Sequence, residues 1–171
     1  MQIDFTNIGT YTITPDRLKA KWRFINDMYG EIPDEHLDRL KSLNEEASRF
    51  LWDFLSMTNL HEDIPFKRGF FQIIEKEKIL DDNQQEIKKW LFQRGLPFER
   101  EVFVSWQSKD AMIVPWKLLL KYFDHFSYAD FTIFEQSLQW AILFYQEDEI
   151  FFGAKKDFKP SNIGNDYDFI R

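Results

Sequence analysis

Residue types that commonly act in catalysis or bind metals are present in this chain, but not at the spacings that such chemistry requires. His36 lies among acids, His61 belongs to His61-Glu62-Asp63, and His125 follows Asp124. A zinc site needs several nitrogen or sulfur ligands at defined spacing, yet the sequence has no H-E-x-x-H motif and no cysteine. We therefore expect solvated surface histidines, no metal site and no cofactor.

The sequence also lacks the motifs that position a nucleophile or cradle a phosphate. Ser127, His125 and Asp130 supply the residue types of a hydrolase triad, but no G-x-S-x-G motif places a serine on a nucleophile elbow. Neither G-x-x-x-x-G-K nor G-x-G-x-x-G occurs. We predict no catalytic residue and a protein that is not an enzyme.

Acidic and aromatic side chains concentrate instead between residues 116 and 153. Asp124, Asp130 and Glu135 fall at the ends of predicted helices and strands, and Tyr128 and Tyr145 lie nearby in the sequence. Acids around an aromatic centre are typical of a protein interface. The alternative is an ordinary core whose helices and strands end in capping acids.

A second acidic feature is the turn Glu147-Asp148-Glu149 between two apolar runs. Its charges are explained either by solvation of a hairpin tip or by recognition of a basic protein. The predicted partner-binding residues are Asp124, Tyr128, Asp130, Glu135, Tyr145, Glu147, Asp148 and Glu149.

The overall charge limits the class of partner. The chain has 22 Lys and Arg against 29 Asp and Glu, a formal net charge of −7. Such a surface repels phosphate backbones, so we expect no nucleic-acid binding, whereas it suits a basic partner or simply keeps the protein soluble. No run of 18 apolar residues predicts a membrane span, and Met1 to Phe5 does not resemble a signal peptide, so we expect a cytoplasmic protein.

Periodicity and capping residues predict the helices and strands that would position these side chains. Thr14-Pro15-Asp16 begins a helix with Leu18, Trp22 and Ile25 on its buried face, and Pro33-Asp34-Glu35 begins a second. Further predicted helices are 45–57, after a capping box at Ser42-Leu43-Asn44-Glu45, 83–94 and 115–126. Predicted strands are 8–13, 101–106, 111–114, 131–134, 139–145 and 150–153, while 69–75 fits either a strand or the start of a helix.

These elements predict an α+β fold. N-terminal helices pack on an antiparallel sheet of about four to six strands, formed mainly by the C-terminal half. Residues 1–156 form a single domain, and 157–171 are a loosely held polar tail. Trp22, Trp90, Trp116, Phe123 and Trp140 fall on predicted inner faces.

The C-terminal half also has a recognisable pattern. It consists of Val114-Pro115-Trp116, Lys121-Tyr122-Phe123-Asp124-His125-Phe126, Asp130, Ile133, Ser137, Trp140-Ala141-Ile142-Leu143-Phe144-Tyr145 and Phe151-Phe152-Gly153. This run resembles small bacterial cytoplasmic proteins of unknown function, some of which are similar to the immunity proteins encoded beside polymorphic or contact-dependent toxins. Phe123 and His125 stand where the family pattern has Trp and Asp. The resemblance implies neutralisation of a toxin and carries over no catalytic residue.

The leading hypothesis is therefore a non-enzymatic protein-binding domain, an immunity protein that neutralises a basic toxin through an acidic and aromatic surface. The alternative is a small-ligand or enzymatic domain with a pocket between helix 115–126 and the sheet, around Asp124, His125 and Trp140. A third hypothesis is a scaffold or dimerisation module. The sequence leaves the oligomeric state open.

Overall fold

The protein is an α+β domain built around one antiparallel sheet, as the sequence predicts. The computed structural model describes residues 2–14, 21–25, 30–146, 148–161 and 166–170. Its strands are β1 (Thr12–Ile13), β2 (Lys41–Leu43), β3 (Ile73–Lys78), β4 (Glu101–Gln107), β5 (Asp110–Pro115), β6 (Phe131–Phe134), β7 (Trp140–Tyr145) and β8 (Glu149–Ala154). The helices in the described ranges are α1 (Lys21–Ile25), α2 (Asp34–Leu37), α3 (Glu45–Thr58), α4 (Gln84–Phe92), α5 (Trp116–Lys121) and α6 (Phe123–Phe126). Short 3₁₀ turns cover Ile8–Thr10 and Tyr167–Phe169.

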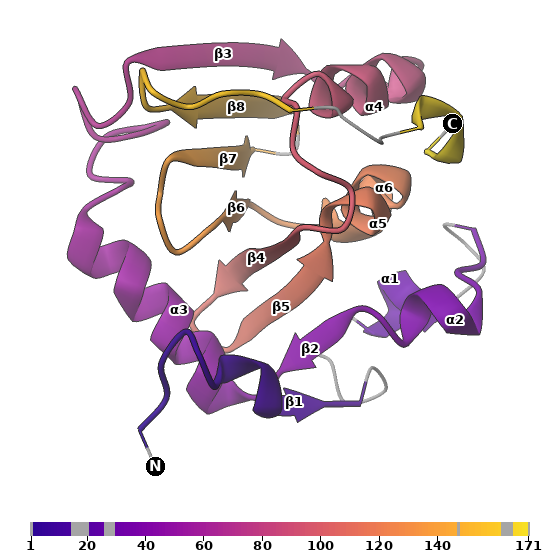
Figure 1. Cartoon of the computed structure of the whole chain (residues 1–171). Helices are drawn as coiled ribbons and strands as arrows, with labels where there is room; N and C mark the ends of the chain where they lie inside the picture. The colour runs from indigo at the N-terminus through magenta and orange to yellow at the C-terminus, as the bar shows by residue number, and fades with distance from the viewer. Residues whose placement is uncertain (1, 15–20, 26–29, 147, 162–165, 171) are drawn as a thin grey trace.

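The sheet is larger than the sequence predicts and draws on both halves of the chain. Its eight strands lie in the order β1-β2-β5-β4-β6-β7-β8-β3. The five central strands, β4 to β8, come from the C-terminal half as predicted. Both edges come from the N-terminal half, with β1 and β2 on one side and β3 on the other (Figure 1). Segment 69–75, which fitted either a strand or a helix, contributes to a strand.

Helices cover both faces of the sheet (Figure 1). α3 lies along one face, and α4, α5 and α6 lie on the other, together with the C-terminal segment. Because successive side chains of a strand point to opposite faces, each central strand feeds two cores. In β6, Phe131 and Ile133 join the core under α5, and Phe134 joins the core under α3. This explains why the central strands are apolar on both faces.

The third predicted helix begins at Glu45 as expected, but its cap lies two residues after the predicted one. The side chain of Asn44, not Ser42, accepts the hydrogen bond of a free helical N–H group, from Ala47 N at 2.9 Å. Ser42 is instead a buried residue of β2, paired with Met112 of β5. The capping-box prediction is therefore wrong, because tertiary pairing takes Lys41–Leu43 into the sheet.

The face assigned to the first predicted helix is also wrong. Trp22 is 48% exposed and Ile25 51%, whereas Arg23 and Phe24 are buried. The Arg23 guanidinium donates to the backbone carbonyls of Asp124 and His125 in α6, which explains why a charged residue faces inward. Of the predicted helix start Thr14-Pro15-Asp16, only Thr14 is among the described residues. Leu18 also lies outside them.

Two other predicted elements are shorter than expected. Of the predicted strand 8–13, only Thr12–Ile13 pairs with the sheet, because Ile8–Thr10 forms a 3₁₀ turn. The predicted helix 115–126 is divided at Tyr122 into α5 and α6.

The predicted loose tail is held against the domain at its described positions. Ile170 is completely buried, and Phe158, Tyr167 and Phe169 pack on the core under α5. The Lys121 ammonium donates to the carbonyl of Phe169 at 2.8 Å. The C-terminal segment therefore extends the hydrophobic core, which its polar composition did not indicate.

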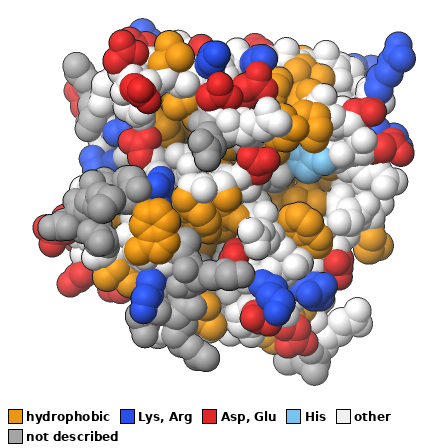
Figure 2. All heavy atoms as spheres, turned by 180° about the vertical axis from the view of Figure 1, so that it is seen from behind, with side chains coloured by type: hydrophobic (Ala, Val, Ile, Leu, Met, Phe, Trp, Pro, Cys, Tyr) orange, Lys and Arg blue, Asp and Glu red, His pale blue; other side chains and the backbone are white. Residues whose placement is uncertain are grey.

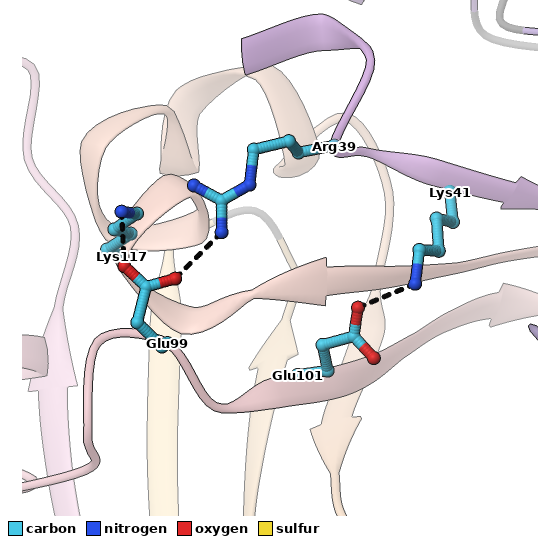
Figure 3. A network of polar contacts seen from close by, with 5 residues as sticks. All are labelled: Arg39, Lys41, Glu99, Glu101 and Lys117. Atoms are coloured by element: carbon cyan, nitrogen blue, oxygen red, sulfur yellow. Dashed lines mark hydrogen bonds and ion pairs between the residues drawn. The ribbon is translucent and has the colours of Figure 1, made fainter. Parts of the chain in front are cut away.

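Ion pairs at the surface connect β2 and β4, and also connect the segments just before these strands with α5 (Figure 3). Glu99 accepts from Arg39 at 2.8 Å and also pairs with Lys117, while Lys41 lies 2.7 Å from Glu101. Hydrogen bonds from Lys117 and Arg39 lower the pKa of Glu99. Exposed pairs of this kind each contribute at most about 1 kcal/mol, so packing rather than charge holds these elements together.

Candidate functional site

A cavity of about 400 Å³ opens on the α3 face of the sheet. Its walls come from the C-terminal half of α3, the loop that follows this helix, and strands β4, β6 and β7. α3 contributes Trp52 and Ser56, the loop contributes His61, and the strands contribute Thr132 and Leu143, among others. This volume lies within the range of sites that bind small ligands or single side chains.

The floor of the cavity follows from the strand register. Ser105 of β4 pairs with Thr132 of β6, and Thr132 pairs with Leu143 of β7, so the three side chains form one row across the α3 face. The neighbouring row, Phe103, Phe134 and Ala141, belongs to the core under α3. Two short polar side chains in an otherwise apolar face leave space unfilled.

His61 closes one side of this floor. Its Nδ1 lies 2.8 Å from the carbonyl oxygen of Pro65, and its Nε2 lies 2.8 Å from the hydroxyl oxygen of Thr132. Burial lowers the pKa of His61 below its usual value, although the bond to the Pro65 carbonyl opposes this shift. The ring is therefore neutral at pH 7. A carbonyl only accepts, so Nδ1 carries the proton and Nε2 accepts from the Thr132 hydroxyl.

Ser105 is the second polar group of the floor. Its side chain is 3% exposed, and among the described residues its hydroxyl has no hydrogen-bond partner. Buried hydroxyls are nearly always hydrogen-bonded, because an unpaired one costs about 1–3 kcal/mol. An unpaired hydroxyl lining a cavity therefore indicates a place where a bound group would find a partner.

The charged residues that line the cavity are both acids, Glu62 and Asp130, and no described lining residue is Lys or Arg. Asp130 is exposed, and its Oδ1 accepts from the backbone N–H of Gln146 at 2.8 Å. Glu62 lies 3.8 Å from Lys67, a long and exposed pair. Lys67 partly offsets the charge of Glu62, so the negative charge at the mouth of the cavity comes mainly from Asp130.

The remaining walls are apolar and partly aromatic. Trp52, which is 41% exposed, and Tyr145 are the aromatic side chains on this face, whereas the side chains of Trp106 and Phe131 belong to the core on the opposite face. Figure 2 shows apolar side chains reaching the surface beside a histidine and carboxylates on the face seen from behind. Aromatic rings combined with acids are the groups that recognise organic cations.

Of the predicted partner-binding residues, the structure brings Asp130 and Tyr145 together at this cavity. Tyr128 stacks on the ring of Trp106 at 5.1 Å between centroids, and burial raises the pKa of its hydroxyl. Asp124 lies on the opposite face, where burial raises its pKa and Lys88 partly offsets the shift. These residues do not form one surface.

The other predicted acids are paired with bases. Glu135 lies 2.9 Å from Arg100, Glu149 lies 2.8 Å from Lys76, and Asp148 lies 3.9 Å from Lys78. Glu147 falls outside the described residues. Two lysines of edge strand β3 thus offset the charges of the β7–β8 turn, which reduces its attraction for a basic protein.

The alternative pocket was expected on the other face, between helix 115–126 and the sheet. There Trp140 is 1% exposed and packs against Trp116, with 6.2 Å between ring centroids. His125 is 4% exposed, and its Nε2 lies 3.1 Å from the carbonyl oxygen of Gly30. Both side chains serve packing at these positions, and the cavity described above lies across the sheet from them.

Sequence reasoning missed His61, Ser105 and Thr132 as site residues. The signal that could have found two of them is polar character within strands otherwise apolar on both faces. His61 offered no such signal, because its partner Thr132 is 71 residues away. Among the described residues there is no cluster of three or more side chains that could hold a metal ion.

His61 makes the stability of the protein depend on pH. Since its pKa is lower in the folded than in the unfolded chain, the unfolded state binds more protons as pH falls through 6.5. We expect the free energy of unfolding to be greatest above this value and to decrease between pH 7.5 and 5.5. A His61→Asn variant should show a smaller decrease in urea titrations over this range. An identical decrease in both proteins would exclude His61 as the cause.

Comparisons with known proteins leave the site to be interpreted from its own geometry. None of the described helices is long and apolar enough to cross a membrane. No protein-family model matches the chain, and neither a curated protein nor a solved structure matches it significantly.

Proposed function

We propose that this chain is a non-enzymatic, cytoplasmic protein-binding domain that neutralises a basic protein, in the manner of an immunity protein acting on its toxin. The partner would dock over the cavity beside α3. The observation that carries the proposal is the charge of this cavity, because Glu62 and Asp130 line it without a described Lys or Arg. The class of partner follows from what the sequence resemblance implies, since some of the small bacterial proteins that residues 114–153 resemble are similar to immunity proteins.

The chain as a whole supports the same proposal. Its net charge of −7 attracts a basic partner over a distance of about 8 Å at physiological salt. Aromatic residues at the cavity, such as Trp52 and Tyr145, are the kind that most often anchor protein interfaces. The cavity offers such an interface a concave centre with a charged rim.

The test is co-expression with the product of the adjacent gene. That product alone should arrest growth, and this chain should restore growth and co-purify with it as a stable complex at 150 mM salt. Lysozyme, an unrelated basic protein, is the control and should not co-elute under the same conditions. A harmless neighbour, or a toxic one that this chain neither binds nor neutralises, would contradict the proposal.

A small-ligand function is the second candidate, favoured by the volume of the cavity and the unpaired Ser105 hydroxyl. It predicts that the isolated chain binds a free organic amine with a dissociation constant on the order of 1 μM, without any protein partner. Calorimetric titration with a panel of primary amines and guanidines would test it. Uniformly millimolar affinities would exclude it.

A further inference from the structure

We infer that the cavity beside α3 is a receptor for the guanidinium group of an arginine side chain presented by the partner. This inference rests on the proposed function and names the group that the site recognises. The observations behind it are the hydrogen-bonding state of the floor, the charge of the rim, and the aromatic walls.

The polar groups of the floor are available mainly as acceptors. Thr132 uses its only hydroxyl proton to donate to Nε2 of the neutral His61, so its remaining capacity is to accept. Ser105, on the neighbouring strand, has a hydroxyl with no partner in the described part of the chain. Both hydroxyl oxygens can therefore accept hydrogen bonds from a group rich in N–H donors.

The rim supplies the matching charge. Asp130 lies two residues before Thr132 in the chain and also lines the cavity. One of its oxygens accepts from Gln146, and no ion pair with a base is formed among the described residues. Each carboxylate oxygen has more than one acceptor site, so Asp130 can bind a cation without losing its contact with Gln146. Glu62 also lines the cavity, although Lys67 partly offsets its charge.

The walls suit the rest of an arginine side chain. Leu143 and Leu55 provide apolar surface for the methylene stem, while Trp52 and Tyr145 provide aromatic surface near the mouth. A guanidinium group is planar, stacks on aromatic rings, and carries five N–H donors in a fixed arrangement. A lysine ammonium carries three donors on one atom and is more strongly hydrated, so it would satisfy fewer of the separate acceptors.

The test uses the isolated chain and a matched pair of probes. N-acetyl-arginine amide is titrated into ¹⁵N-labelled protein, and N-acetyl-citrulline amide replaces the guanidinium by a neutral urea group of nearly the same shape. We expect the arginine probe to bind with a dissociation constant on the order of 1 mM and the citrulline probe at least about tenfold more weakly. The amide signals of Ser105, Asp130 and Thr132 should shift.

Two charge-removing variants distinguish binding at the cavity from general attraction to the negatively charged protein. Asp130→Asn keeps an oxygen that can accept from Gln146 but removes the negative charge, and we expect at least about threefold weaker binding of the arginine probe. Asp81→Asn removes an equal charge at an exposed position after β3, outside the cavity, and should leave the affinity unchanged.

Equal binding of arginine and citrulline probes would overturn the inference. Shifts confined to residues outside the cavity, or the same affinity in Asp130→Asn as in the unaltered protein, would do so as well. These results concern the isolated chain, so they are distinct from failure of the proposed function, which is the absence of a complex in co-expression. A stable complex that survives Asp130→Asn unchanged would leave the proposed function standing and remove the arginine site.

Discussion

Replacing Trp116 by alanine is expected to lower the free energy of unfolding by about 3–5 kcal/mol. The side chain is completely buried at the start of α5, in the core on the opposite face of the sheet from α3. Its ring contacts that of Trp140, so removing it leaves a large cavity between the helix and β7. Equilibrium unfolding in urea, with the denaturant dependence checked for constancy, measures the loss.

Two further tryptophan variants make this expectation specific. Trp116→Phe should cost less than about 2 kcal/mol, since Trp116 Nε1 has no hydrogen-bond partner among the described residues and a ring still fills the site. Trp22→Ala should cost less than about 1 kcal/mol, because this side chain is 48% exposed. The sequence predicts both Trp22 and Trp116 on inner faces, so similar losses for the two alanine variants would contradict the structure.

Replacing Gly153 by alanine is expected to cost about 1–3 kcal/mol through overpacking. Gly153 lies in β8, between Ala141 of β7 and Ile74 of β3. A methyl group there would meet Cδ2 of Phe71 and Cε2 of Phe66 at 2.8 Å or less, closer than side-chain carbons approach. The aromatic pair covers the strand so closely that only glycine fits beneath it.

A second substitution identifies the clash as the cause. Phe71→Leu removes part of the obstructing ring, so Gly153→Ala should cost less in the Phe71→Leu background than alone. Strict additivity of the two losses would contradict the clash. Because Phe66 stacks on the ring of His61 at 5.7 Å between centroids, Gly153→Ala should also shift the His61 signals at the cavity.

The sequence correctly predicted the helices and strands whose formation depends on residues close together in the chain. Apolar residues recur at spacings of three and four along α3, where Ala47, Leu51 and Leu55 are buried and Phe50 and Phe54 are half-buried. Gly95 has a φ of 74°, the left-handed conformation expected after the helix that it follows. The strands from 101 to 154 follow equally from β-branched and aromatic runs bounded by turn residues.

Errors arose where distant contacts outweigh local preference. Ser42 has the sequence context of a helix cap, but pairing with Met112 places it in the sheet. Trp22 fits an apolar stripe, but Arg23 is the buried residue, because its guanidinium donates hydrogen bonds to the carbonyls of Asp124 and His125. Neither partner lies within 60 residues of the position that it controls, so no local pattern could have indicated the outcome.

The candidate site was predictable only in part for the same reason. Asp130 and Tyr145 could be selected as an acid and an aromatic residue at strand ends, and both line the cavity. The floor depends on the strand order β4-β6-β7, which places Ser105 beside Thr132, and on a loop that brings His61 to them. Register and strand order are properties of the whole sheet and are not encoded in any one segment.

A structure of the complex with the adjacent gene product is the most direct test of the central claim, that the acidic cavity beside α3 receives the basic partner. We predict that an arginine of the partner enters the cavity, with its guanidinium within hydrogen-bonding distance of Asp130 and of Thr132 or Ser105 and against the ring of Trp52 or Tyr145. A complex in which the cavity remains open to solvent and the partner binds another face would contradict this claim.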